Sequence, residues 1–245
     1  FFFKQKTAYE ISTRDWSSDV CSSDLARVLA WLERWLQTEW PHFKVFLTSV
    51  TDQWATIALA GPKSRAVLQK VCSDLDFDDG SFPFMSAREG RVAGLSARIF
   101  RISFSGERGY EINVAARYGR ALWEALYAAG AEFGITPYGT EAMHLLRAEK
   151  GFIIVGQDTD GSVTPVDLGM ASMVSASKDC LGKRSLARSD TSRVDRKQLV
   201  GLLSDPPEIV LPEGAQVLRP GESVGRKTPV PMDGHVTSSY ASPTL

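Results

Sequence analysis

The stretch RISFSGERGYEINV, Arg101–Val114, carries a carboxylate in an unusual setting. Two runs of strand-forming residues flank a Gly-containing turn, which predicts a β-hairpin. If the loop is Gly106–Gly109, Phe104 lies directly opposite Glu111, and the two side chains share a face of the sheet. A carboxylate among aromatic residues needs a partner, because removing a charge from water without one is costly.

Glu111 has two interpretations. As a surface residue it reaches water near the end of the hairpin, or forms an ion pair with Arg101 or Arg147. As a binding residue, it accepts hydrogen bonds from a planar pair of N–H and NH₂ donors while Phe104 stacks on the same ring, which a pterin or a guanidine would satisfy. The residue pattern alone leaves both interpretations open.

Other chemical signals are weak. His42, His144 and His235 are far apart in the sequence, and Cys72 and Cys180 are isolated. We therefore predict no metal site, disulfide framework or nucleophile triad. Cys180 is interpreted as a small core residue.

Composition limits the class of protein. The chain has 245 residues, of which 43% are hydrophobic and 23% charged, as in an ordinary globular protein. A net charge of −1 argues against nucleic-acid and polybasic membrane-surface partners. No run approaches the roughly 18 apolar residues of a membrane span. Because the cysteines form no disulfide pattern, we expect a cytoplasmic protein.

The first segment stands apart from the rest. Lys4–Leu25, KQKTAYEISTRDWSSDVCSSDL, resembles the conceptual translation of a sequencing adapter. We expect residues 1–25 to be disordered and the natural chain to begin near Ala26. Leu245 shows no terminal signature, so we interpret the sequence as a fragment of a longer protein.

Two kinds of pattern follow along the chain. Apolar spacing predicts helices at 26–40, 62–71, 117–134 and 138–150, with Gly134 as a C-terminal cap. Strands are predicted at 45–50 and 54–59, and three or four more between 81 and 115, with turns at Glu89–Gly90 and Gly106–Gly109. After Arg184, short strands alternate with Pro and Gly turns, which predicts a small antiparallel barrel.

We therefore expect two domains. The first is an α+β domain at 26–185, and the second is a β-rich domain at 195–245. The segment SLARSDTSRVDRK would link them.

Several runs, in order, resemble the folate-binding aminomethyltransferase superfamily, that of the glycine-cleavage T-protein. They are IALAGPKSRAVL, SFSGERGYEINV, LLRAEKGFIIVGQDTDGSVTPVDLG, SKDCLGKRSL and GHVTSSYASPTL. The resemblance spans nearly all of Ala26–Leu245. It implies ferredoxin-like α/β domains of the aminomethyltransferase fold, truncated at the N-terminus, followed by a small antiparallel β-barrel. Within the superfamily, ITPYGTEAMHLLRAEKGFIIVGQDTDG is most similar to alpha subunits of heterotetrameric sarcosine oxidases.

The resemblance also implies site residues. Phe104 falls where the family has a folate-contacting Tyr, and Glu111 where it has the pterin-binding Glu. Met143 falls where the family has a folate-contacting Arg, so that contact must differ. The family's substrate-side Asp falls at or before Arg27–Val28, which leaves the catalytic residues unassigned.

The implied function is tetrahydrofolate binding. A flavin-carrying partner subunit of a hetero-oligomer would oxidise sarcosine, and this domain would capture the one-carbon unit as 5,10-methylenetetrahydrofolate. FMN or FAD and NAD would bind elsewhere in the full complex. The alternatives are a glycine-cleavage aminomethyltransferase, a dimethylglycine dehydrogenase folate domain, and a non-catalytic folate-dependent iron–sulfur maintenance protein.

Overall fold

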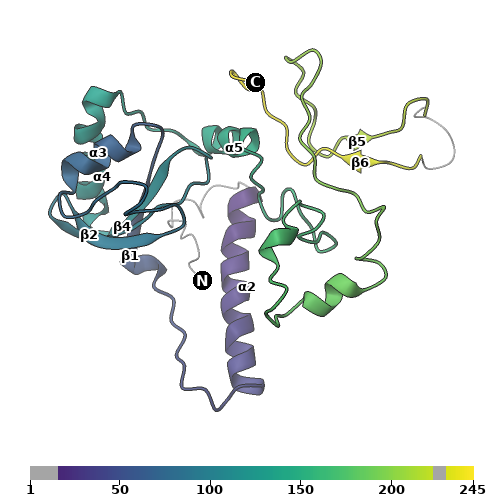
Figure 1. The fold of residues 1–245 in the computed structure, drawn as a ribbon, viewed down its shortest axis with the longest axis horizontal. Helices are drawn as coiled ribbons and strands as arrows, with labels where there is room; N and C mark the ends of the chain where they lie inside the picture. Colours follow the sequence, from purple (N-terminus) through teal and green to yellow (C-terminus); the bar gives the residue numbers. More distant parts are fainter. Residues whose placement is uncertain (1–15, 223–229) are drawn as a thin grey trace. The chain divides into compact units, whose positions relative to one another are not determined.

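The computed structural model describes residues 16–222 and 230–245 (Figure 1). The chain divides into two compact units, one ending at His144 and the other spanning Leu145–Leu245. The predicted domain boundary at 185–195 lies within the second unit and stays a prediction.

The first helix, α2, runs from Trp16 to Thr38. It includes residues 16–25, for which disorder is the expectation from sequence, and that segment has no Pro or Gly to interrupt a helix. The interpretation of residues 4–25 as a translated adapter stays a prediction, and residues 1–15 lie outside the described part of the chain. Trp31 and Trp35 pack edge to face with ring centroids 6.1 Å apart, although Trp31 stays well exposed.

A four-stranded antiparallel sheet forms the centre of the first unit. Its strands are β1 (Trp54–Ala60), β2 (Ala87–Val92), β3 (Leu95–Phe100) and β4 (Gly109–Ala115). Their order across the sheet is β1-β4-β3-β2. The fold class is therefore confirmed as mixed helix and sheet with an antiparallel sheet.

Two strand predictions for this unit are wrong. Residues 45–50 form no strand, and Phe46 is 96% exposed, so this run has no core on which to pack. The turn predicted at Glu89–Gly90 lies inside β2, and the chain reverses instead at Ala93 and Gly94, both with positive φ. Such a two-residue turn matches the twist of paired strands, but Ala rarely adopts positive φ, which hid the turn in the sequence.

Three further helices follow the predictions closely. They are α3 (Ser64–Val71), α4 (Gly119–Gly130) and α5 (Thr140–Glu149). Gly134 adopts the predicted left-handed conformation after the last turn that follows α4. Short 3₁₀ segments are found at Thr51–Gln53, Ala116–Tyr118, Ala131–Phe133, Ala171–Met173 and Lys183–Ala187.

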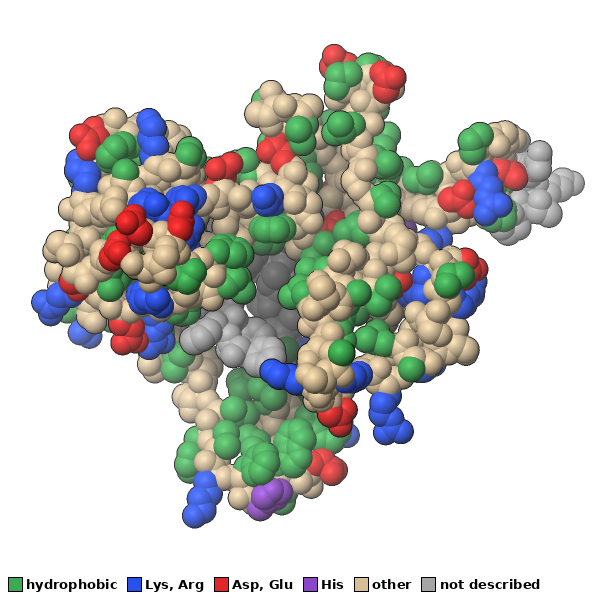
Figure 2. Space-filling model, in the orientation of Figure 1, with side chains coloured by type: hydrophobic (Ala, Val, Ile, Leu, Met, Phe, Trp, Pro, Cys, Tyr) green, Lys and Arg blue, Asp and Glu red, His purple; other side chains and the backbone are tan. Residues whose placement is uncertain are grey.

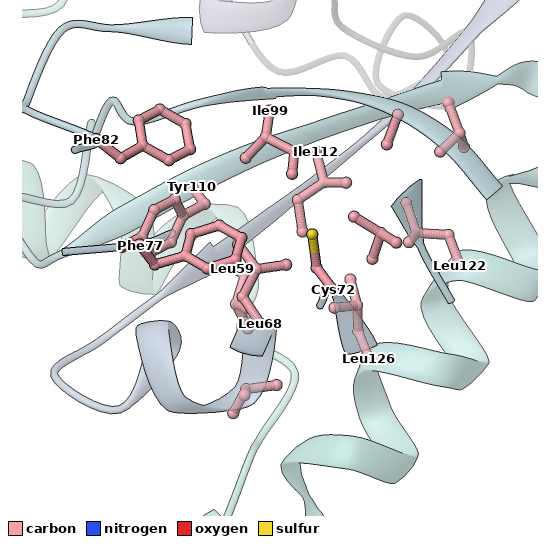
Figure 3. Close-up of a cluster of buried hydrophobic side chains, with 14 residues drawn as sticks. Leu59, Leu68, Cys72, Phe77, Phe82, Ile99, Tyr110, Ile112, Leu122 and Leu126 are labelled. Carbon is pink, nitrogen blue, oxygen red and sulfur yellow. The ribbon is translucent and has the colours of Figure 1, made fainter. Parts of the chain in front are cut away.

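The core of the first unit lies between one face of the sheet and helices α3 and α4 (Figure 3). Side chains alternate along β4, so Tyr110 and Ile112 point into this core while Glu111 points to the opposite face. Phe77, Phe82 and Tyr110 form an aromatic group, with Phe77 and Tyr110 edge to face at 5.7 Å. The helices therefore cover one face only and leave the other for different contacts.

The second unit has little regular structure among its described residues. Its strands are β5 (Gln216–Val217) and β6 (Gly234–His235), which pair antiparallel. No closed sheet is formed by the described residues, so the predicted barrel is not confirmed.

Buried polar groups organise this unit instead. Arg147, 2% exposed, donates to Asp158 at 2.5 Å and to Ser238 Oγ at 2.6 Å. Asp158 also accepts hydrogen bonds from the Ile154 N–H, Thr237 Oγ1 and Ser238 Oγ. This network joins two of the runs that resemble the aminomethyltransferase superfamily, although they lie far apart in the sequence.

A second buried carboxylate, Asp167, has a similar role. It accepts hydrogen bonds from the N–H and Oγ1 of Thr164, both at 2.8 Å. Arg196 adds an ion pair at 2.6 Å and also donates to the Ser162 carbonyl. These contacts connect residues 162–167 to the chain beyond residue 190.

Charges of both signs are interspersed over the face shown in Figure 2. Hydrophobic side chains gather near the C-terminal end of α2, where Trp40 and Phe43 are exposed and stack on each other. None of the described helices is long and apolar enough to cross a membrane.

Candidate functional site: a carboxylate pocket on the open face of the sheet

The hairpin that carries Glu111 has a different register from the predicted one. Phe100, and not Phe104, lies opposite Glu111, and β3 ends there. The connection to β4 therefore runs from Arg101 to Arg108 and is longer than the predicted Gly106–Gly109 loop. The predicted loop length was wrong because the strand-forming residues at 101–105 were taken to continue β3 up to the turn glycines, whereas β3 ends at Phe100.

Contacts outside the hairpin hold this connection. The Arg101 N–H donates to the Ser86 carbonyl, and its guanidinium lies 2.6 Å from Asp79. At the other end, the Arg108 carbonyl accepts hydrogen bonds from the Gly61 N–H and Ser64 Oγ. Asp79 also pairs with Arg108 at 3.0 Å, so both ends of the connection are bound to residues outside the hairpin.

Glu111 lies on the face of the sheet opposite helices α3 and α4. Its neighbours across the two adjacent strands are Ala58 on β1 and Phe100 on β3. The small Ala58 side chain leaves space beside the carboxylate, and Glu111 is 8% exposed. Of the two arginines considered in the sequence, Arg101 contacts Asp79 and Arg147 contacts Asp158.

A small pocket surrounds Glu111. Its lining includes Phe104 from the loop and Met143 from α5, so the structure brings the predicted residues Phe104, Glu111 and Met143 together. Glu111 is the one Asp, Glu, Lys, Arg or His residue in this lining. The enclosed volume is about 30 Å³, enough for a water molecule and too small for an aromatic ring.

Tyr138 also lines the pocket, and the sequence interpretation missed it. Burial and the nearby negative charge of Glu111 raise the pKa of the Tyr138 phenol. The phenol is therefore neutral at physiological pH and can donate or accept a hydrogen bond. The only sequence signal was an aromatic residue shortly before α5, in the segment PYGTEAM.

Polar contacts continue along the same face, away from the pocket. Thr56 Oγ1 donates to Asn113 Oδ1 at 2.5 Å, one step further along β1 and β4. Arg98 pairs with Glu89 at 3.0 Å and lies over the ring of Trp54. The open face of the sheet thus carries hydrogen-bonding groups beside the apolar side chains of Trp54, Ala58 and Phe100.

A larger hollow lies at the other end of β1 and β4. It has a volume of about 460 Å³ and is lined by Gln53, Trp54, Ala115, Ala116 and Arg117. This hollow is wide open and holds no buried charged group, whereas the smaller pocket has a buried carboxylate among aromatic side chains. We therefore place the candidate site at Glu111.

Metal and thiol chemistry receive no support in the described chain. No group of three or more His, Cys, Asp or Glu side chains there could hold a metal ion. Burial, followed by a hydrogen bond to Asp74, raises the pKa of the Cys72 thiol to about 12. Cys180 is exposed, so its interpretation as a core residue is wrong.

The pocket is suited to one kind of ligand group. The Glu111 carboxylate can accept two parallel hydrogen bonds, and Phe104 and Tyr138 offer aromatic faces. A flat ring with adjacent N–H and NH₂ donors matches this set. An anionic group would meet the Glu111 charge and no cation in the lining.

The sequence profile of the GCVT N-terminal domain family matches residues 2–178, which is more than half of the chain. The chain therefore belongs to the GCVT N-terminal domain family.

Similar proteins include sarcosine oxidase alpha subunits and aminomethyltransferases. The chain is 55% identical over 221 residues to sarcosine oxidase subunit alpha of Corynebacterium sp. (strain P-1), covering 90% of this chain and 23% of that protein. It is 39% identical over 246 residues to the sarcosine oxidase subunit alpha of Rhizobium meliloti (strain 1021), covering 99% of this chain and 24% of the relative. An aminomethyltransferase of Clostridium botulinum (strain Loch Maree / Type A3) is 33% identical over 215 residues, covering 86% of this chain and 54% of the enzyme. The chain thus spans less than a quarter of the sarcosine oxidase subunits that it matches.

Among solved structures, the heterotetrameric sarcosine oxidase from Corynebacterium sp. U-96 in complex with pyrrole 2-carboxylate matches 42% of this chain and 51% of its own chain. The TM-score is 0.36 and the sequence identity 21%. Similarity at this level does not establish that the two chains share a fold.

Proposed function

We propose that this chain is the tetrahydrofolate-binding part of a sarcosine oxidase alpha subunit. In this function it captures the one-carbon unit from oxidised sarcosine as 5,10-methylenetetrahydrofolate. The observation that carries the proposal is the shared pocket of Phe104, Glu111 and Met143, which come from separate segments of the chain. The 55% identity to a sarcosine oxidase alpha subunit supports the choice of reaction.

The lining fits the pterin end of tetrahydrofolate by its chemistry. A pterin carries adjacent ring N–H and NH₂ donors, which Glu111 can accept, and a flat ring, which Phe104 can stack against. The carboxylates at the other end of the molecule would be repelled by Glu111, which gives the ligand one direction of entry. Because the enclosed volume is about 30 Å³, the pocket must widen to admit the ring.

The residues of this chain would hold and orient the ligand. When bound, tetrahydrofolate supplies the amines that take up a one-carbon unit. Glu111 fixes the position of the ring, and the surrounding side chains exclude water from it. Exclusion of water matters because water would otherwise compete for a reactive one-carbon unit.

Met143 lines the same pocket as Glu111 and departs from the superfamily pattern. The aminomethyltransferase superfamily has an arginine at this position, whereas Met143 offers an apolar, adaptable side chain. In this proposal Met143 contacts the ring and its immediate substituents, and the anionic end is bound by other residues.

The test is a titration of the full-length protein with tetrahydrofolate. We expect Glu111→Gln to weaken binding by about 1.5–3 kcal/mol, because a charged acceptor is lost. The control is Glu107→Gln, an exposed residue of the same loop, which should bind as tightly as wild type. Equal affinity of the Glu111→Gln variant and wild type would remove the assignment.

The proposed partner is a flavin-carrying subunit of a hetero-oligomer, with FMN or FAD and NAD bound outside this chain. Co-purification of the full-length protein with a flavin-containing subunit is the expected result, and recovery of a flavin-free single chain would argue against it.

A second candidate is an aminomethyltransferase, because the 33% identity to such an enzyme extends over 86% of this chain. The discriminating assay offers a lipoyl-carrier protein bearing an aminomethyl group. Transfer of the one-carbon unit from that carrier would favour the second candidate over the first.

A further inference from the structure

The pocket contains a residue that neither the sequence patterns nor the relatives assign. We propose that Tyr138 is a ligand-contacting residue of the Glu111 pocket and forms the wall that faces the bound ring together with Phe104. This inference rests on the proposed function and extends it from the carboxylate to the aromatic part of the site.

The position of Tyr138 carries the argument. It lies in the short connection between Gly134 and α5, two residues before the helix begins, and lines the pocket together with Glu111. Its side chain is 41% exposed, so it contributes little to any core. An aromatic residue that is half open to solvent beside a buried carboxylate has surface available for a ligand.

The chemistry of the phenol supports the same role. Burial raises the pKa of the Tyr138 phenol, and the nearby charge of Glu111 raises it further. A neutral hydroxyl adds a donor and an acceptor to a lining that otherwise offers one charged acceptor. The flat ring adds stacking surface on which a pterin, with its own flat ring, can lie.

The two contributions differ in expected size. Stacking of an aromatic side chain on a flat heterocycle accounts for about tenfold in affinity, and a single neutral hydrogen bond for a few-fold. Removal of the ring should therefore cost more than removal of the hydroxyl alone.

The experiment measures tetrahydrofolate affinity for the full-length protein by calorimetric titration. We expect Tyr138→Leu to weaken binding about tenfold and Tyr138→Phe about two- to threefold, with thermal stability close to wild type. The control is Tyr127→Leu, a tyrosine on α4 of similar exposure that does not line the pocket and should leave affinity unchanged. Tyr138→Gln provides a second ring-less variant if the leucine variant does not fold.

The outcomes separate the inference from the function on which it rests. Wild-type affinity in Tyr138→Leu or Tyr138→Gln, with weakened binding in Glu111→Gln, overturns the role of Tyr138 and leaves the proposed function intact. Equal losses in Tyr138→Leu and Tyr127→Leu also overturn it, because the effect would then not come from the pocket. No tetrahydrofolate binding by wild type overturns both.

Discussion

The two compact units bury different kinds of side chain. Among the described residues, every buried hydrophobic side chain except Ile154 belongs to the first unit. The second unit buries polar and charged groups instead, namely Arg147, Asp158, Thr164 and Asp167. One unit is thus held mainly by apolar packing and the other mainly by hydrogen bonds and ion pairs.

This difference predicts different sensitivities. Apolar packing depends little on pH or on any single polar atom, and its cost on mutation follows the volume removed. A buried ion pair contributes little compared with a well-packed apolar pair, but removing one partner leaves the other charged and buried. The second unit should therefore respond sharply to changes at its few polar contacts.

The largest effect is expected for Asp158→Ala. It leaves the buried Arg147 guanidinium without its carboxylate and also removes the acceptor used by Thr237 and Ser238. We expect a loss of about 3–5 kcal/mol in the free energy of unfolding of the second unit. Hydrogen exchange followed by peptide mass spectrometry can measure each unit separately.

The matched control is Asp233→Ala in the same unit. Asp233 pairs with Arg219 at 2.9 Å, and both side chains are largely exposed. Such pairs contribute at most about 1 kcal/mol. If the two variants lose the same stability, the buried network is not what holds this unit.

A somewhat smaller effect is expected for Leu68→Ala in the first unit. Leu68 is fully buried on α3, where that helix faces the sheet. Removing its side chain should cost about 3 kcal/mol, as for other buried leucines. Exchange protection should fall along β1, β3 and β4 and stay unchanged in residues 145–245. Loss of exchange protection in both units would show that they unfold together and would contradict the prediction that the first unit unfolds independently of the second.

Acid should affect the second unit first. Burial of Asp158 opposes its ionisation, but hydrogen bonds from Ile154, Ser238 and Thr237 and the charge of Arg147 hold its pKa below the usual range. Arg196 and Thr164 likewise lower the pKa of Asp167. A carboxyl whose pKa is lower in the folded state stabilises that state above the unfolded pKa, about 3.9, and loses this contribution as pH falls through the folded value.

We therefore expect the second unit to lose exchange protection below about pH 4, before the first unit does. The carboxylates of lowered pKa in the first unit, Asp74, Asp76 and Asp79, are exposed and screened by solvent. Asp158→Asn should flatten the acid response of the second unit. An unchanged response in that variant would assign acid sensitivity to other groups.

Sequence patterns predict the first unit much better than the second. Helices α3 and α4 follow apolar spacing, and Gly134 caps the 3₁₀ turn that follows α4, because these signals are local. In the second unit, Pro and Gly turns predicted a barrel, yet the described chain is organised by Arg147 and Asp158. Which polar side chains meet across the chain has no local signal.

The Glu111 pocket was also predicted only in part from the sequence. The sequence predicted only that Glu111 shares a face of the sheet with Phe104. In the structure Tyr110 and Ile112 point into the core, so Glu111 points to the other face of β4. The predicted loop register was wrong, because strand pairing ends at Phe100 and Glu111, and Arg101 and Arg108 bond to residues outside the hairpin. Phe104 nevertheless reaches the Glu111 pocket, through the loop rather than through strand pairing.

The smallest effect is expected on the open face of the sheet, where the first unit most resembles the second in its polar contacts. Thr56→Val removes the hydroxyl that donates to Asn113 Oδ1 but keeps the shape of the side chain. Asn113 retains contacts with the carbonyls of Arg98 and Glu111. We expect a loss of about 1 kcal/mol in the free energy of unfolding, measured in urea.

The control for this variant is Thr136→Val, in an exposed loop, which should change stability by less than about 0.5 kcal/mol. A loss as large as that of Leu68→Ala would mean that the open face also holds the first unit together. The first unit would then depend on polar contacts as well as on apolar packing, and would differ less from the second unit. A loss near 1 kcal/mol would show that this hydrogen bond adds to a unit held mainly by its apolar core, as expected for a single neutral pair.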